Sequence, residues 1–435
     1  MSTDDLEKQL LSRLRAFPSP PRGFDPRKAS DKILEKHGFP HRPDPKAQPI
    51  AHAVWDRVLS RPLKIVKPTF EIVDAPRRAR PRRPNQKDMD WSTSNWSGAV
   101  SMPASGAKFT MIAASWIVPS VVVPPTGAAL PPATYTASVW VGIDDSDLLQ
   151  AGTACQIDVG ADGVPQPTYF AWFEWLPYNY VKLPSIPVGP GDEIHVAIIG
   201  SNTTGSVYFA NLTRNTATSF SVDPPPGTSL LGNYAEWILE RYAGDLADFR
   251  AVFFHDVVAF EATGTGATFR KTEVQPSAAS STPVRMTDAL GHTATGAFGD
   301  GFVEVYYGTQ TPRPRPSPPT RRDRLSAGQG LRTGQSLVSD DGRFKLLLQL
   351  DGNLVIYDPA ARPLWASNTA ARPEVSDAFM QGDGNLVVYD IAGRPLWASN
   401  TWGHPGAWLN MQDDGNLVVY DSGNRPLWAS DTVQS

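Results

Sequence analysis

The sequence predicts an all-β protein in which a short helical leader precedes two folded units. From Trp91 onward, short segments alternate apolar and polar residues between turns rich in Gly, Pro, Asn and Asp, which is typical of antiparallel strands. Near the C-terminus one segment recurs three times, at intervals of 32 and 31 residues, which indicates a repeat architecture. The 435 residues also exceed the length of one ordinary domain, so several folded units are expected.

Residues 1–90 are predicted to form the leader, with three short helices. The first spans residues 4–16 with Thr3 as its N-cap, and the second begins after Ser30 and stops at Gly38. The third lies in "PIAHAVWDRVLSRP", where apolar residues recur at helical spacing. The segment that follows, "DAPRRARPRRPNQKD", is basic and rich in proline, so it is expected to be extended, either as a solvated linker or as a processing site.

The leader and the middle of the chain carry opposite charges. Residues 1–90 hold 20 Lys and Arg against 12 Asp and Glu, a net charge of +8. Residues 91–308 hold 8 against 19, a net charge of −11. The two parts therefore attract each other. We expect the leader to act as a propeptide that is held near neutral pH and released when acid protonates the carboxylates.

Composition disfavours several other classes of protein. Cys155 is the only cysteine, which excludes an intrachain disulfide. The N-terminal residues lack the apolar core of a standard signal peptide, and no apolar run is long enough to predict a membrane span. The basic segment has no interleaved aromatic residues, so no nucleic-acid partner is expected.

Residues 91–308 are predicted to form a two-sheet antiparallel β-sandwich of the jelly-roll kind, because alternating segments follow one another without a long helix. These segments are "FTMIAASWIVPS", "TASVWVGID", "PTYFAWFEWLP", "DEIHVAIIG", "GSVYFANLT", "AEWILERY" and "FVEVYYG". Residues 309–324, with "TPRPRPSPPTRRDR", are predicted to be a semi-rigid Pro/Arg linker. Residues 325–435 hold the repeats.

Each repeat contains the pattern Gln-x-Asp-x-Asn-x-Val-x-Tyr. In a strand, a spacing of two places all five side chains on one face. Such a row offers donors and acceptors for the neighbouring hydroxyls of a sugar, above an apolar valine. The alternative is a polar surface on a repeat scaffold. The predicted carbohydrate-binding residues are Gln349, Asp351, Asn353, Val355, Tyr357, Gln381, Asp383, Asn385, Val387, Tyr389, Gln412, Asp414, Asn416, Val418 and Tyr420.

These motifs resemble those of the bulb-type mannose-binding lectins over about residues 325–435. The resemblance implies a three-fold β-prism of four-stranded sheets with one sugar pocket in each sheet, and a preference for mannose-containing glycans. It also implies a central position for the tryptophans of the three "RPLWAS" segments, Trp365, Trp397 and Trp428. Modules of this family often pair, so a lectin-mediated dimer is expected.

The middle unit has few groups that support catalysis. His255 and His292 are far apart in sequence, Cys155 has no evident base, and no Gly-x-Ser-x-Gly motif occurs. Histidines at metal-ligand spacing are also missing, so neither a metal nor another cofactor is expected. Serine, cysteine and metal-dependent hydrolases are therefore disfavoured, and carboxylate and amide chemistry remains.

Five segments of the middle unit, "NWSGAV", "VWVGID", "LLQAG", "AWFEW" and "NYAEWILE", resemble the glutamic peptidases, or eqolisins, in the order of that family. The resemblance implies an acid-acting endopeptidase for polypeptide substrates. Glu236 would take a proton from the attacking water, and the amide of Gln150 would donate to the oxyanion. The substrate cleft would be lined by Trp96, Trp140, Asp144, Trp172 and Glu174.

One position departs from the fungal members of that family, because Ala154 stands where they carry an aspartate four residues after the glutamine. Two other functions compete with the peptidase. The middle unit could be a glycoside hydrolase with Glu174 and Glu236 as paired carboxylates, or an inactive sandwich in an adhesin. We expect a secreted or extracellular protein, exported without a visible signal peptide, released by lysis, or translated from a start other than Met1.

Overall fold

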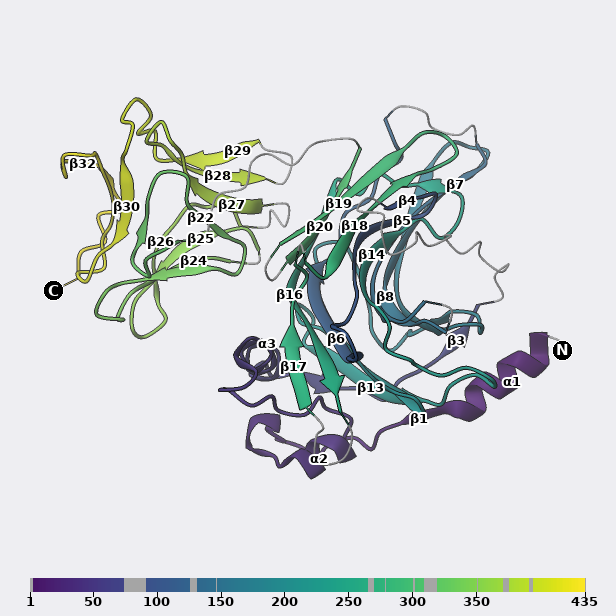
Figure 1. Ribbon diagram of the computed structural model, residues 1–435. Helices are drawn as coiled ribbons and strands as arrows, with labels where there is room; N and C mark the ends of the chain where they lie inside the picture. Colours follow the sequence, from purple (N-terminus) through teal and green to yellow (C-terminus); the bar gives the residue numbers. More distant parts are fainter. Residues whose placement is uncertain are drawn as a thin grey trace. The chain divides into compact units, whose positions relative to one another are not determined.

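The computed structural model describes residues 3–73, 91–125, 131–145, 147–264, 270–277, 279–299, 302–308, 319–349, 351–370, 375–390 and 394–434. The chain divides into two compact units, Met1–Gln310 and Thr311–Ser435, and strands dominate both (Figure 1). The predicted all-β class is confirmed. No helix among the described residues is long and apolar enough to cross a membrane.

Within the first unit, the leader forms short elements that pack on the sandwich. They are α1 (Thr3–Arg13), β1 (Leu14–Ala16), the 3-10 helix η1 (Pro26–Lys28), α2 (Asp31–Lys36), α3 (Pro49–Leu59), β2 (Lys64–Ile65) and β3 (Glu71–Ile72). The prediction of one helix over residues 4–16 is wrong at its end, because Leu14–Ala16 pairs with strand β13 instead. Ser30 precedes α2 but makes no side-chain capping bond. The Arg-rich stretch lies outside the described residues.

One sheet, here called the front sheet, has the strand order β18, β5, β14, β7, β8, β9, β10, β3. Short strands β4 and β15 pair with β18 and β7. The bounds are β4 (Trp91–Thr93), β5 (Trp96–Ser101), β7 (Ala133–Ile143), β8 (Leu149–Val159), β9 (Pro165–Trp175), β10 (Val181–Lys182), β14 (Ala235–Glu240), β15 (Asp245–Leu246) and β18 (Ser281–Thr287).

The second sheet, the back sheet, has the order β1, β13, β12, β11, β6, β16, with β17 and β20 both pairing with β16. Strand β19 (Thr293–Gly299) pairs with β18 and with β20, so it links the two sheets. The remaining bounds are β6 (Lys108–Ile117), β11 (Glu193–Ser201), β12 (Thr204–Asn211), β13 (Thr216–Val222), β16 (Ala251–Thr263), β17 (Arg270–Val274) and β20 (Phe302–Tyr307).

Successive side chains of a strand point to opposite faces of its sheet, so the sandwich has a core between the sheets and two outer faces. In β14, Trp237 and Leu239 enter the core between the sheets, whereas Glu236 and Ile238 face the other side of the front sheet. Helix α3 of the leader lies beside the back sheet (Figure 1). Its residues Trp55 and Val58 pack in one cluster with side chains of β6, β11, β12 and β16. The sandwich therefore carries the leader helices on one sheet and the predicted catalytic residues on the other.

The second unit consists of three four-stranded sheets, as the lectin resemblance implies. They are β21, β30, β31, β32; β22, β27, β28, β29; and β23, β24, β25, β26. The bounds are β21 (Arg324–Leu325), β22 (Gly330–Arg332), β23 (Ser336–Val338), β24 (Lys345–Leu348), β25 (Leu354–Tyr357), β26 (Pro363–Ala366), β27 (Val375–Met380), β28 (Leu386–Asp390), β29 (Pro395–Ala398), β30 (Trp408–Met411), β31 (Leu417–Tyr420) and β32 (Pro426–Ala429).

The first residues of this unit complete sheets formed by later repeats. Arg324 pairs with Asn410, and the carbonyl of Asp323 accepts from the N–H of Met411. The described part of the unit thus begins before residue 325, where the sequence placed its start. Most of the predicted linker, residues 309–318, lies outside the described residues.

Candidate active site and sugar-binding sites

Residues from four adjacent strands form one row on the front sheet. Glu236 of β14 pairs with Gly142 of β7, which pairs in turn with Gln150 of β8. Gln150 pairs on its other side with Glu174 of β9. Directly paired residues in antiparallel strands place their side chains on the same face. Since neighbouring strands lie about 4.8 Å apart, the Cα atoms of Glu236 and Gln150 are about 10 Å apart.

Gly142 adds no side chain between Glu236 and Gln150, and its surroundings are closely packed. A Cβ atom at Gly142 would lie 2.7 Å from Cδ1 of Leu148 and 3.2 Å from Cβ of Gln150. Any larger residue would therefore have to displace Leu148, Trp140 or Gln150. The sequence motif "VWVGID" contains this glycine, but only the strand register gives it a role.

Glu174 fixes the orientation of the Gln150 amide. Nε2 of Gln150 donates a hydrogen bond of 2.6 Å to Oε2 of Glu174. A carboxylate only accepts, so the NH₂ end of the amide faces it, and one N–H of that group remains for another acceptor. Oε1 of Gln150 is buried and accepts no hydrogen bond within the described part of the chain. The amide thus offers one donor and one acceptor to a bound molecule.

Aromatic side chains surround this row. Nε1 of Trp140 donates to Oε2 of Glu240 at 3.1 Å, and Nε1 of Trp172 donates to Oγ of Ser138 at 3.0 Å. The rings of Trp96 and Trp140 meet edge to face at 5.0 Å. We call the following set the dyad cluster: Trp91, Trp96, Val100, Trp140, Leu148, Ala154, Trp172, Tyr180, Ile238 and Val284. Ala154 therefore contributes an apolar side chain to the wall beside the row.

Asp144 holds the loop that leads into β14. Its carboxylate accepts hydrogen bonds from the backbone N–H groups of Leu231, Gly232 and Asn233, which lead into β14. The backbone of Asp144 has a positive φ of 71°, which is unusual outside glycine. Burial raises the pKa of Asp144, and the three backbone donors oppose this rise. Asp144 thus positions the strand that carries Glu236.

The two predicted catalytic side chains are buried in this form of the chain. Gln150 is 3% exposed and Glu236 is 0% exposed. Val73, the last described leader residue before the Arg-rich stretch, packs against the dyad cluster, and its N–H donates to the carbonyl of Tyr180 at 3.2 Å. Trp91, the next described residue, belongs to the cluster. Val73 and Trp91, on either side of the Arg-rich stretch, therefore both lie on the face that carries Gln150 and Glu236.

The row does not favour Glu174 and Glu236 as the paired carboxylates of a glycoside hydrolase. Glu174 and Glu236 are three strands apart, so their Cα atoms are about 14 Å apart, and Gln150 lies between them. Glu174 is also hydrogen-bonded to Gln150. No group of three His, Cys, Asp or Glu able to hold a metal occurs among the described residues.

A second polar cluster, which the sequence did not predict, joins the leader to the back sheet. We call it the leader ion cluster: Arg57, Arg61, Ser115, Glu193, His195, His255 and Asp256. Nη1 of Arg57 lies 2.7 Å from Oε1 of Glu193, and Nη2 of Arg61 lies 3.0 Å from Oε2 of the same glutamate. Arg57 also pairs with Asp256. The opposite charges of the two parts predicted attraction, but strand pairing decided which carboxylates meet.

Hydrogen bonds extend this cluster into the sheet. Oγ of Ser115 lies 2.9 Å from Nδ1 of His195 and donates to Oδ2 of Asp256 at 2.8 Å. Burial lowers the pKa of His195 to about 4. Burial alone would raise the pKa of Glu193, but the nearby His255 and the charge of Arg57 lower it to about 2. Protonation of Glu193 or of His195 would therefore weaken the contact between the leader and the sheet.

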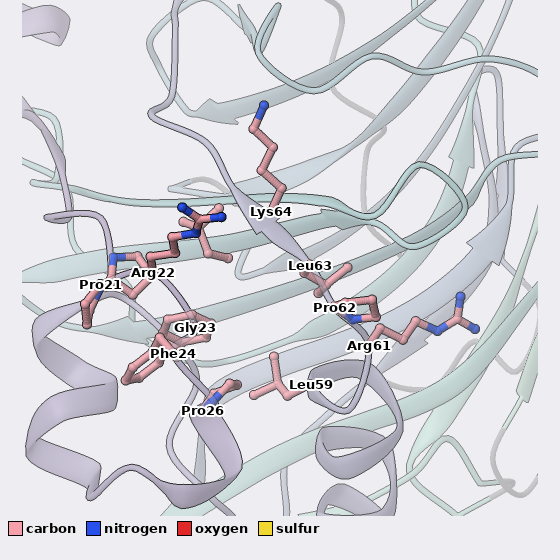
Figure 2. Close-up of a pocket in the computed structure, with 13 residues that line it drawn as sticks. Pro21, Arg22, Gly23, Phe24, Pro26, Leu59, Arg61, Pro62, Leu63 and Lys64 are labelled. Atoms are coloured by element: carbon pink, nitrogen blue, oxygen red, sulfur yellow. The ribbon is translucent and has the colours of Figure 1, made fainter.

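A pocket lies within the leader itself (Figure 2). The residues that line it lie between Pro20 and Ile65, and they include the apolar side chains Phe24, Leu59 and Leu63. None of the predicted catalytic or sugar-binding residues lines it. This pocket is therefore separate from the row on the front sheet.

In the second unit, the sugar motif folds differently from the predicted single strand. Strand β24 ends at Leu348 and β25 starts at Leu354, so Gln349, Asp351 and Asn353 lie in the connecting turn. The prediction of five side chains on one strand face is wrong for each repeat, because Asp-Gly favours a turn and Gly352 has a φ of +85°. Val355 and Tyr357 do lie in strand β25.

The turn nevertheless brings the motif together. Nε2 of the motif glutamine donates to the hydroxyl of the motif tyrosine in all three repeats, at 2.5, 2.8 and 2.8 Å. The aspartate accepts the N–H of the asparagine at 3.0, 3.0 and 2.9 Å. Trp365, Trp397 and Trp428 contact one another with centroid distances of 5.3–5.5 Å, although they are only partly buried. The three repeats therefore present the same arrangement of polar groups.

A two-sheet sandwich with this polar row, followed by a three-fold prism, defines a peptidase joined to a lectin-like unit. The chain belongs to the peptidase A4 family, whose model matches residues 94–297, and it is a glutamic-type endopeptidase, a hydrolase. It is 30% identical to aspergillopepsin-2 from Aspergillus niger over 236 residues, which are 49% of this chain and 78% of the relative.

Two solved structures are also similar to parts of the chain. A scytalido-glutamic peptidase crystallised with a transition-state analogue inhibitor is 25% identical, covers 49% of this chain and 98% of its own, and has a TM-score of 0.38. A monomeric monocot mannose-binding lectin from Gastrodia elata is 43% identical, covers 26% of this chain and 98% of its own, and has a TM-score of 0.23.

Proposed function

We propose that Gln150 and Glu236 form the catalytic dyad of this endopeptidase. The observation that carries the proposal is the row in which Glu236, Gly142 and Gln150 occupy directly paired positions on three adjacent strands. Gly142 places no side chain of its own between the two functional groups, and Leu148 and Trp140 pack closely beside it in this buried form. Such a site needs neither a nucleophilic side chain nor a metal.

The proposed reaction balances with these two groups alone. The Glu236 carboxylate takes a proton from water while the water oxygen bonds to the peptide carbonyl carbon. The second N–H of Gln150 donates to the resulting oxyanion. Protonated Glu236 then gives its proton to the leaving nitrogen as the C–N bond breaks, which releases a carboxylic acid and an amine. Trp96, Trp140 and Trp172 form walls beside the row.

Glu174 acts as a positioning residue in this scheme, because it touches Gln150 rather than substrate. Glu174→Gln is expected to lower kcat about tenfold while leaving KM within about twofold, since a neutral amide fixes the Gln150 rotamer less firmly. Steady-state assays on a quenched peptide at acid pH measure this, and Glu174→Asp should recover part of the loss. An unchanged kcat for Glu174→Gln would remove this role.

We further propose that residues 1–90 are a propeptide and that the enzyme acts outside the cell. The burial of Gln150 and Glu236 supports a latent form, because a peptide cannot reach a carboxylate that is 0% exposed. The packing of Val73 and Trp91 against the dyad cluster connects the leader to this face. The leader ion cluster supports release in acid, where such an enzyme would work.

The second unit is proposed to bind mannose-type glycans and so to place the peptidase on glycosylated targets. Its support is the threefold recurrence of a turn that holds Gln, Asp, Asn and Tyr together. Each aspartate keeps one carboxylate oxygen, Oδ1, on the backbone of the turn. The lectin part could also pair two chains.

Replacing the three motif aspartates by asparagine should abolish retention of the full chain on immobilised mannan. Asn can still accept the backbone N–H that shapes the turn, but it loses the charged acceptor, which is worth about 1.5–3 kcal/mol per site. Single variants Asp351→Asn, Asp383→Asn and Asp414→Asn should each lose part of the binding. Retention of the triple variant at the level of the unmodified chain would contradict sugar binding at these turns.

A further inference from the structure

The three sugar motifs are flanked by different residues although their turns are alike. In each repeat a threonine hydroxyl donates to the carbonyl of the turn glycine, at 2.6, 2.7 and 2.7 Å. The N–H of the same threonine donates to Oδ1 of the motif asparagine, at 3.2, 3.1 and 3.3 Å. The residue directly after this threonine is therefore held beside the turn. It is Ala370, Trp402 and Val433 in the three repeats.

In the second repeat, contacts on both sides hold Trp402 near the motif. Thr401 binds Gly384 and Asn385, as described, and the N–H of His404 donates to the carbonyl of Asp383 at 2.9 Å. Gly384 has a φ of +94°, and a Cβ atom there would lie 2.3 Å from the carbonyl oxygen of His404. The segment 401–404 therefore lies directly against the turn that carries the polar motif residues.

Trp402 is also the most exposed tryptophan of the chain. Its residue surface is 69% exposed, whereas the other twelve tryptophans, all within the described residues, are buried or half-buried. Leaving a large apolar ring in water forgoes the free energy that its burial would give. An exposed aromatic ring beside a set of hydroxyl-binding groups matches the surface of a sugar, which has polar edges and an apolar face of C–H groups.

We propose that Trp402 extends the second sugar site into a two-residue subsite. A terminal hexose would bind at Gln381, Asp383, Asn385 and Tyr389, and the next hexose of the same oligosaccharide would stack on the indole ring of Trp402. The inference rests on the sugar binding proposed above. Ala370 offers no ring at the first site, and Val433 offers none at the third. The three sites are thus equivalent toward a monosaccharide and unequal toward an oligosaccharide.

Calorimetry on the full chain at neutral pH tests this with two probes, methyl α-mannoside and an α-linked mannotriose. To isolate the second site, the Asp351→Asn and Asp414→Asn changes are present in every protein compared. Trp402→Ala is expected to weaken mannotriose binding about tenfold, or about 1.4 kcal/mol, and to change methyl α-mannoside binding less than twofold. Trp402→Phe should retain part of the mannotriose affinity, and Val433→Ala is the matched control.

The outcomes separate the two proposals. Equal mannotriose affinity with and without Trp402, while methyl α-mannoside still binds, overturns the subsite and leaves the sugar site intact. Absence of binding to both probes in the protein with Trp402 overturns both. A change in sedimentation coefficient on Trp402→Ala, without a change in sugar affinity, would instead assign the ring to contact with a second copy of the chain.

Discussion

Replacing Glu236 by glutamine is expected to lower kcat at acid pH by about 10³-fold or more, because no other described group in the row is placed to take the proton of the attacking water. Gln150→Ala should cost about 10²- to 10³-fold, the usual loss for one oxyanion donor. The double variant should be little worse than Glu236→Gln, since the two groups act in one step. Cleavage of a denatured protein and of a short peptide, each after removal of the leader, measures both effects.

Matched controls separate chemistry from folding. Gln156 lies on the same strand and the same face as Gln150, and its Oε1 accepts from the hydroxyl of Tyr242 at 3.0 Å, away from the row. Gln156→Ala should therefore leave kcat within about twofold. Thermal melts of all variants check stability. Full cleavage by Glu236→Gln would refute the dyad, and release of reducing sugar without peptide cleavage would point to a glycosidase.

Acid is expected to release the leader from the back sheet. Although burial opposes the shift, His255 of the sheet together with Arg57 and Arg61 of the leader lowers the pKa of Glu193 to about 2, from an ordinary value of 4.5. A carboxylate with a lowered pKa stabilises the docked state above its ordinary value, and this stabilisation is lost as the pH falls from about 4.5 toward 2. The pKa of Asp256 is lowered too, so it acts in the same direction.

Protonation of His195 also weakens docking of the leader, but over a higher pH range. Its pKa is lowered to about 4 by burial and by the charge of Arg57, while Asp256 and Glu193 oppose this. A histidine kept neutral in the docked state but protonated after release favours release as the pH falls from its ordinary value of 6.5 toward 4. Docking should therefore weaken progressively below about pH 6.5 and be weakest near pH 2.

Hydrogen exchange of the α3 segment, followed from pH 7 to pH 3 in the Glu236→Gln protein, measures this release without self-cleavage. Rates are corrected for the intrinsic pH dependence of exchange. Arg57→Met should raise the exchange of α3 about tenfold or more at neutral pH, because it leaves Glu193 and Asp256 without their shared cation. Arg15→Met is the control, since that side chain pairs with Asp223 and belongs to β1 rather than to α3. Equal protection of α3 at both pH values would contradict an acid-sensitive contact.

Much of the architecture could be predicted from local patterns. Period-two alternation identified β6, β7, β9, β11, β12, β14 and β20, and the repeat of about 32 residues identified the second unit. Predictions failed where a distant partner competed with local preference. Leu14–Ala16 continues a helical pattern but joins β13 as a strand, and the sugar motif looks like one strand but folds as a turn around Gly352.

The sequence by itself determined the types of group that the protein can use: a glutamate and a glutamine in ordered motifs, a basic leader before an acidic sandwich, and three copies of a polar motif. Only the tertiary structure decided their partners. Register placed Gly142 between Glu236 and Gln150 and put Glu174, not a residue at position 154, on the amide. The physical reason is that strand pairing joins residues by hydrogen bonds between distant segments, which local residue patterns do not encode.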